Sequence, residues 1–252
     1  MSRFSFAALL LCGALTASGC ADTASADGTS DLSRTLLSQP ANDGQSTLIG
    51  GEPGAGDDGG PRVQVSDVGV NRGSPDALVK VVEMSDYGCG YCRQFHMDSF
   101  AALREEFIET GMVEWKFVPY ITGMFDNSLA VTEAADCAYV QDVAAFERLN
   151  RRIWDEQRSW KGSSEPATVV RDWASEVGID LAAFDSCLES DQQIPRIAAA
   201  TTLARQLGVR GTPTFVVIGY PPLQGALPLD TFREILTMVH AEATAAAQGA
   251  RP

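Results

Sequence analysis

The chain has 252 residues, of which 45% are apolar, so it is long enough to bury one sizeable hydrophobic core. Its formal net charge is −14, from 33 acidic against 19 basic residues. Such a charge repels phosphate backbones and anionic membrane surfaces, so we expect one main folded domain and no nucleic-acid partner.

The first 19 residues predict a signal peptide. Arg3 precedes an apolar run from Phe4 to Leu15, which is too short to span a bilayer, and small residues follow it. Residues 17–20, which read ASGC, resemble a bacterial lipobox, although Ala17 stands where Leu is usual. This resemblance implies that Cys20 carries a lipid. The alternative is an ordinary secretory signal that is cut near the same place.

The cysteine count favours the lipidated form. Of six cysteines, Cys12 leaves with the signal peptide, and the four between positions 89 and 187 can form two pairs. Cys20 would then be an odd free thiol in an oxidising compartment unless it is lipidated. We therefore expect a lipid-anchored protein of the bacterial cell envelope, on its periplasmic or extracytoplasmic face.

Residues 20–62 predict a flexible tether. They are rich in Gly, Ser, Asp and Thr, and such a segment cannot bury enough apolar surface to offset the entropy lost on ordering. A small ordered subdomain around Leu32–Leu37 is the alternative.

The folded domain is expected over residues 63–245 and opens with a β-α-β pattern. Leu78–Met84 is a run of largely β-branched apolar residues, typical of a buried strand. A helical pattern begins at Cys89 and ends at Gly111, a plausible C-cap, and Val113–Val118 reads as the second strand.

Helical signals alone fill residues from about 125 to 207. Strand character returns at Thr214–Gly219 and continues weakly through Leu223–Leu227 as a hairpin partner. A last helix has apolar residues at helical spacing from Phe232 to Val239. We expect its Ala-rich end past Ala241 to fray, and residues 246–252 to form a disordered tail.

The chemistry is expected at Cys89 and Cys92, which lie where the first strand has ended and the helix begins. Unpaired N–H groups and the helix dipole stabilise a thiolate there, so the pKa of Cys89 should fall below its ordinary value. Cys92 lies one turn further and can attack a mixed disulfide formed by Cys89. This order predicts an exposed nucleophile, Cys89, and a shielded resolving thiol, Cys92.

Three other interpretations of this pair are open. Half of a zinc site would need two more ligands, but the chain has no second C-x-x-C motif and no closely spaced histidine pair; its two histidines are His96 and His240. A purely structural disulfide would be unusual between a strand and a helix. The two thiols and His96 could also hold copper for delivery.

The segment Ser85–His96, which reads SDYGCGYCRQFH, resembles the active-site segment of the DsbA-like disulfide oxidoreductases of bacterial envelopes, members of the thioredoxin superfamily. Gly211–Phe215 resembles the cis-proline loop of that family, and Gly225–Phe232 resembles the entry to its last helix. The resemblance covers about residues 68–242. It implies an α/β, thioredoxin-like fold with an inserted helical domain at about residues 125–207, and no cofactor.

The resemblance also assigns residues to roles. Thr212 and Pro213, joined by a cis bond, would face the cysteine pair and bind an extended substrate together with Gly90 and Tyr91. Glu83, in the first strand, resembles the buried acid that exchanges a proton with the resolving cysteine, and we expect burial to raise its pKa. The alternative for Glu83 is a solvated charge at the end of the strand.

Two further cysteines lie in the predicted helical block. Similar positions occur in some members of the family, which implies a structural disulfide between Cys137 and Cys187; two separate buried thiols are the alternative. His96 is expected to be a partly exposed helix residue without a catalytic role.

The expected function is therefore thiol-disulfide oxidoreduction on cysteines of exported proteins, with a membrane redox partner and with the membrane reached through the lipid anchor. A non-catalytic copper-handling or thiol-binding module is the alternative. The Gly-Tyr dipeptide between the cysteines departs from the Pro-His of strongly oxidising members, so oxidation, reduction and isomerisation all remain open. Because Tyr91 stabilises a thiolate less than His would, we expect the pKa of Cys89 to fall only moderately.

Overall fold

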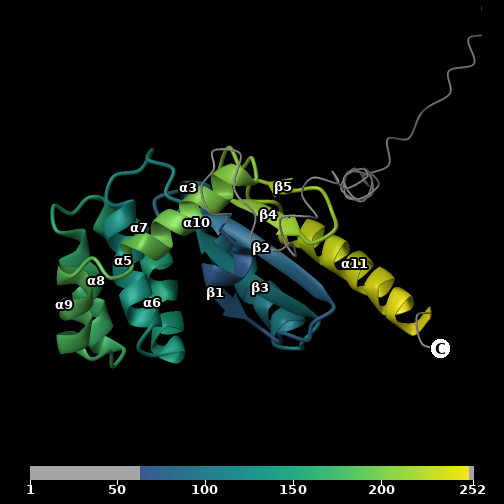
Figure 1. Cartoon of the computed structure of the whole chain (residues 1–252), viewed down its shortest axis with the longest axis horizontal. Coiled ribbons are helices and arrows are strands. Elements are labelled where there is room, and N and C mark those ends of the chain that lie inside the picture. The colour runs from purple at the N-terminus through teal and green to yellow at the C-terminus, as the bar shows by residue number, and fades with distance from the viewer. Residues whose placement is uncertain (1–62, 250–252) are drawn as a thin grey trace, which may run out of the picture.

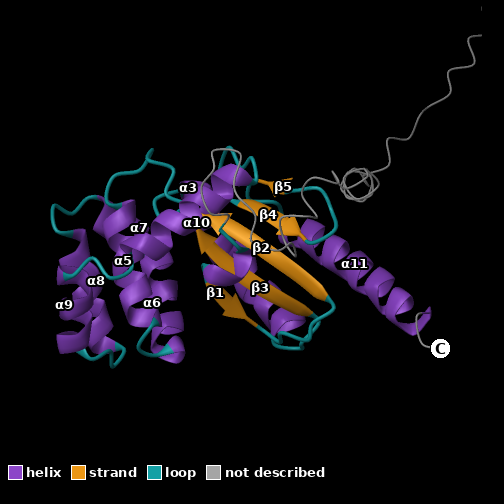
Figure 2. Ribbon diagram, viewed as in Figure 1, coloured by secondary structure: helices purple, strands orange, loops and turns teal. Residues whose placement is uncertain are grey.

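A computed structural model describes residues 63–249 of the chain. The predicted signal peptide (1–19), the predicted tether (20–62) with Cys20, and residues 250–252 lie outside the described residues. The described part combines a mixed five-stranded sheet with helices on both of its faces and a separate group of helices at one side (Figures 1 and 2).

The sheet has the strand order β1-β3-β2-β4-β5. Central strand β2 runs parallel to β3 and antiparallel to β4; the outer strands β1 and β5 are antiparallel to β3 and β4. The strands are β1 (Val70–Arg72), β2 (Val79–Ser85), β3 (Val113–Pro119), β4 (Thr214–Val217) and β5 (Leu223–Gln224). Strand β2 is buried at all positions but one, as the apolar run predicts.

Alternating residues of the strands supply two separate cores, because successive side chains point to opposite faces. Val81 packs on one face with residues of the first helix and of α11 (Leu229–Gly249). Val82 and Met84 pack on the other face against α10 (Ile194–Gln206). Glu83 shares a face with Val81, so its side chain points toward the first helix.

The first helix joins β2 to β3. It starts as α3 (Gly90–Phe95), passes through a π-helical turn at His96–Phe100, and continues as α4 (Ala101–Leu103) and a second π-helical turn at Arg104–Ile108. Gly111, with φ at 78°, follows its end in the left-handed conformation that glycine adopts freely. This confirms the predicted β-α-β unit.

The inserted helical block stands beside the sheet, at the left of Figure 1. Asp142 and Asp180 accept hydrogen bonds from backbone N–H groups at the starts of two of its helices and so fix where these begin. The block contains α5 (Ser128–Tyr139), α6 (Val143–Asp155), α7 (Gln157–Lys161), α8 (Pro166–Glu176) and α9 (Leu181–Glu189). Its apolar core also includes Tyr87, Cys89 and Cys92, so the block packs directly against the cysteine segment.

Two features differ from the sequence predictions. Strand β1 is not predicted, because three residues are too few to show an alternating pattern. The last helix does not fray past Ala241: α11 continues to Gly249, so part of the predicted disordered tail is helical. Alanine has the highest helix propensity, so the Ala-rich end stays helical although it lies at the end of the domain. None of the helices in the described part is both long and apolar enough to cross a membrane.

Candidate active site

Cys89 and Cys92 occupy the start of the first helix, as the sequence predicts. Cys89 is the N-cap residue of α3, and its own carbonyl accepts the first helical hydrogen bond, from Arg93 N–H. Its exposed fraction is 4%, against 0% for Cys92. The expected exposed nucleophile is therefore nearly covered, because the loop at Thr212 and the helical block both pack over it.

Asp86 shapes the loop that ends β2 and presents Cys89. Its buried carboxylate accepts hydrogen bonds from Gly88 N–H, from the backbone and side chain of Thr122, and from the Ser128 hydroxyl. Gly88 has no alternative here, because a Cβ at this position would lie 2.3 Å from the Cβ of Phe125. The loop is thus fixed from inside by one carboxylate, which sequence reasoning missed.

Helix α7 holds the same loop from the helical block. The buried Gln157 amide donates to the carbonyls of Tyr87 and Cys89, at 2.6 and 2.9 Å. Lys161 Nζ donates to the carbonyl of Gly88 at 2.6 Å. Three successive carbonyls before the helix therefore depend on two side chains that lie about seventy residues further along the chain.

The loop before β4 faces the first cysteine. The Thr212–Pro213 peptide bond is cis. Cys89 Sγ lies 3.3 Å from the carbonyl oxygen of Thr212, to which it donates when it is protonated. The structure thus brings Thr212 and the cysteine pair together from segments separated by 123 positions.

The two thiols differ in acidity. The pKa of Cys89 falls from 9.0 to about 6, and the largest cause is a hydrogen bond from Cys92. Thr212 and the backbone N–H groups of the first helical turn lower this pKa further, while burial opposes them. Burial, together with the adjacent Cys89, raises the pKa of Cys92 well above its ordinary value. At neutral pH the pair therefore holds a thiolate at Cys89 and a thiol at Cys92.

Glu83 is fully buried and not a solvated strand end. It accepts hydrogen bonds from the Ser85 hydroxyl at 2.5 Å and from the Trp115 indole at 2.9 Å, and it pairs with His96 at 2.7 Å. We expected burial to raise the pKa of Glu83. Burial does act in that direction and is the largest single effect, but His96 and the three hydrogen bonds together outweigh it, so the pKa lies below its usual value.

His96 corrects a second expectation. The sequence predicts a partly exposed residue, whereas the imidazole is buried, with 8% of the residue exposed, and its Nε2 contacts Glu83. Two signals point to this contact: a carboxylate in an apolar strand needs a partner, and His96 lies on the Cys92 face of the helix, four residues later.

The described residues do not form a cluster of metal ligands at the cysteine pair. Within residues 63–249, no set of three or more His, Cys, Asp or Glu side chains is placed to hold a metal ion. His96 faces Glu83 and not the two thiols, so the ligands that a copper site at this pair would need do not converge in this part of the chain.

The second cysteine pair lies in the helical block. Cys137 of α5 and Cys187 of α9 form a disulfide, with their Cα atoms 5.9 Å apart and 50 positions between them in sequence. Both residues belong to the same apolar core as the surrounding helices.

A family model described as thioredoxin matches residues 66–237, which is more than half of the chain. The chain belongs to the thioredoxin family. Among curated relatives of this thioredoxin-family protein is the "Probable disulfide bond formation protein D" of Bacillus cereus, which is 29% identical over 153 residues, or 58% of this chain and 68% of the relative.

Solved structures share the fold. Oxidised BdbD from Bacillus subtilis superposes with a TM-score of 0.63 at 19% identity, over 77% of this chain and 98% of that one. Wolbachia pipientis α-DsbA1 gives a TM-score of 0.63 at 20% identity, over 70% and 93% of the two chains. These likenesses confirm the thioredoxin-like fold with a helical insertion.

The activity follows from the site and the relatives together. A thiolate and a thiol at the start of one helix can form, exchange and break disulfides. The curated relative described above is named "Probable disulfide bond formation protein D". This thioredoxin-family protein is a thiol-disulfide oxidoreductase.

Proposed function

We propose that Cys89 is the thiol that exchanges with substrate and that Cys92 resolves the mixed disulfide, on cysteines of exported proteins. The opposite pKa shifts of the two adjacent thiols carry this assignment. The Cys89 thiolate attacks a substrate disulfide, whose other sulfur leaves as a thiolate. Cys92 then loses its proton and attacks Cys89 Sγ, so the second substrate sulfur leaves. The substrate gains two electrons and the pair becomes a disulfide; the reverse sequence oxidises a substrate dithiol.

Substrate binding is assigned to the surface around Cys89. Tyr91 is 67% exposed, and a Cβ at Gly90 would meet nothing within 4 Å, so the face beside the pair is open. The loop at Thr212 and Pro213 lies next to Cys89 Sγ and precedes strand β4. An extended peptide that reaches Cys89 would pass along this loop and pair with the backbone of Thr212.

Glu83 is assigned the role of accepting the proton that Cys92 loses. The Ser85 hydroxyl donates to the carboxylate of Glu83 at 2.5 Å, and Ser85 is near enough to Cys92 to lower the pKa of that thiol. A proton that leaves Cys92 therefore has a path through the Ser85 hydroxyl to a buried anion. Exchange of this proton is required in each turnover, because Cys92 is a thiol before its attack.

The place of action is the bacterial cell envelope, outside the cytoplasm, where disulfides persist. Lipidation at Cys20 would anchor the chain, and a membrane oxidase or reductase would recharge the cysteine pair. Cys20→Ser should move the protein from the membrane fraction to the soluble fraction of the envelope, since one residue carries the anchor. An unchanged distribution would contradict the lipid anchor.

The cysteine roles are tested by trapping. Cys92→Ser should accumulate mixed disulfides with substrate proteins, because the attack that releases them is lost, while Cys89→Ser should form none. Both variants are incubated with envelope proteins, quenched with acid and separated without reductant. The Cys89→Ser/Cys92→Ser double variant is the control. Equal trapping by the two single variants would contradict the assignment.

A further inference from the structure

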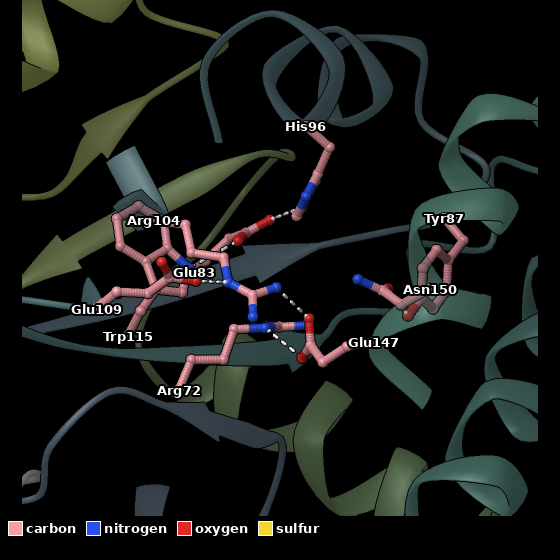
Figure 3. A network of polar contacts seen from close by, with 9 residues as sticks. All are labelled: Arg72, Glu83, Tyr87, His96, Arg104, Glu109, Trp115, Glu147 and Asn150. Carbon is pink, nitrogen blue, oxygen red and sulfur yellow. Dashed lines mark hydrogen bonds and ion pairs between the residues drawn. The ribbon is translucent and has the colours of Figure 1, made fainter. Parts of the chain in front are cut away.

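A chain of polar side chains leads away from the cysteine pair into the protein. Ser85, which lowers the pKa of the neighbouring Cys92, donates from its hydroxyl to Glu83 Oε1 at 2.5 Å, and the same oxygen lies 2.7 Å from His96 Nε2. Trp115 holds the other carboxylate oxygen at 2.9 Å. Figure 3 shows Glu83 between Trp115 and the imidazole of His96. Each member is buried, so Ser85, Glu83 and His96 form one continuous hydrogen-bonded path behind Cys92.

This path ends at a cavity. His96 lines a cavity of about 200 Å³ between the first helix and α6, together with Met97, Phe100, Arg104, Asn150 and Trp154. The imidazole stacks on Trp154, with ring centroids 4.3 Å apart and planes at 9°, which fixes its orientation. Within the described chain, Nε2 has Glu83 as its partner and Nδ1 makes no hydrogen bond. Of Ser85, Glu83 and His96, it is His96 that lines this cavity.

The low pKa of Glu83 creates a difficulty that this arrangement removes. A carboxylate whose pKa is held down by three hydrogen bonds and a neighbouring imidazole is a weak proton acceptor on its own. Imidazole accepts a proton at one ring nitrogen and gives one up from the other, which suits it to a shuttle. A proton that arrives at the pair of Glu83 and His96 can therefore rest on the imidazole.

We infer that His96 relays the proton of Cys92 between Glu83 and water in the cavity. When Cys92 attacks the mixed disulfide, its proton passes to Ser85, whose own proton moves to Glu83. His96, in its neutral form with the proton on Nδ1, takes that proton at Nε2 and releases the proton of Nδ1 to water. In the oxidising direction, the same groups return a proton to Cys92 as it leaves. This inference rests on the proposed role of Glu83.

Charged groups around the cavity do not supply another base of the same kind. Facing His96 are Glu83 from β2, Arg104 from the same helix, and Glu147 and Arg151 from α6. Glu147 is held by Arg72 at 2.7 Å and by Arg104 at 3.2 Å (Figure 3). A carboxylate shared by two guanidinium groups is a poor proton acceptor, so His96 is the side chain at this cavity suited to carry the proton.

The test isolates the step that releases the Cys92 proton. Cys89 is converted to its mixed disulfide with glutathione, and release of glutathione by Cys92 is followed by rapid mixing from pH 5 to 9. His96→Gln keeps an amide donor for Glu83 but cannot carry a proton, and it should slow release about tenfold or more at pH 7. His96→Ala should be slowed similarly and recover as imidazole is added. His240→Gln, at the other histidine, should match the unmodified protein.

The outcomes separate the relay from the role of Glu83. Slow release in Glu83→Gln with full speed in His96→Gln would overturn the relay and leave Glu83 as the acceptor. Full speed in both variants would overturn the role of Glu83 as well. The alkylation rate of Cys89 in each variant reports whether the site is still formed. Slow release in a folded His96→Gln, together with rescue of His96→Ala by imidazole, supports the relay.

Discussion

The two cysteine pairs of this protein are buried to the same extent and differ in what surrounds them. Cys89 and Cys187 are each 4% exposed, and Cys92 and Cys137 are each 0% exposed. Cys89 and Cys92 stand three positions apart at the start of one helix, whereas Cys137 and Cys187 join two helices across 50 positions. Burial therefore does not decide which pair does chemistry.

The two pairs differ in reactivity because of their hydrogen bonds and because the first pair lies at the start of a helix. The Cys89 thiolate is stabilised most by a hydrogen bond from Cys92, and Thr212 and the first-turn N–H groups add to this effect; Ser85 lowers the pKa of Cys92. Around the second pair, the side-chain polar contact is a long one, from the Gln193 amide to Cys187 Sγ at 3.9 Å. A thiolate at the second pair would find no comparable stabilisation, so we expect this disulfide to be structural and not to exchange with substrates.

The largest effect that distinguishes the pairs should be on stability. Replacement of both Cys137 and Cys187 by Ala should lower the free energy of unfolding by about 2–4 kcal/mol, because the bond closes a loop of 50 positions in the unfolded chain. Denaturant unfolding of the oxidised protein and the double variant measures this difference. Release of glutathione from Cys89 should change less than about twofold, since the pairs lie on different elements.

The matched control is removal of the first pair alone. Cys89→Ala/Cys92→Ala removes a bond that closes no comparable loop, because three positions separate these residues, so the free energy of unfolding should change much less. A double variant at 137 and 187 that unfolds like the unmodified protein, or one that loses exchange at Cys89, would remove the distinction between a structural pair and a redox pair.

The features that could be predicted from the sequence are those that carry a local pattern. The Cys89–Cys92 segment, the strand before it and the helical block all carry local patterns, and the structure shows each of them. The cis bond before Pro213 came from the family resemblance, because a sequence alone favours trans for any X-Pro bond.

The features that could not be predicted from the sequence depend on contacts between residues far apart along the chain. Gln157 and Lys161 hold carbonyls about seventy positions away, and no local pattern marks them. The sequence predicts a partly exposed His96, because no local pattern shows that Glu83, 13 positions earlier on a strand, faces the imidazole. The direction of the pKa of Glu83 was missed for the same reason, since burial was visible in the sequence and the three donors were not.

A smaller effect tests how far the neighbours of Cys89 set its acidity. Alkylation of Cys89 by iodoacetamide should rise with pH, with a midpoint near pH 6, and then level off, because the thiolate is the reacting form. The sign of the linked stability follows. Between about pH 6 and 9, the unfolded reduced protein keeps a proton on Cys89 that the folded protein has lost. The reduced form therefore gains stability as pH rises through this range, and loses it as pH falls through about 6.

Tyr91→His should move both the acidity and the potential, by the least amount of the changes considered. Tyr91 is largely exposed between the cysteines, so His there can add a cationic or hydrogen-bonding group beside the thiolate with little disturbance of packing. We expect the alkylation midpoint to fall by about one pH unit or less. Since one unit is about 1.4 kcal/mol, the two-electron potential should become more oxidising by about 30 mV at most. For the unmodified protein, we expect a potential between about −120 mV, typical of a strong oxidant, and about −270 mV, typical of thioredoxin. Equilibration in glutathione buffers measures both proteins, and Tyr91→Phe, which keeps the ring without a new polar group, should leave the midpoint and the potential unchanged. A shift of equal size in Tyr91→Phe, or none in Tyr91→His, would show that the helix start and Cys92 set the acidity of Cys89 without the dipeptide.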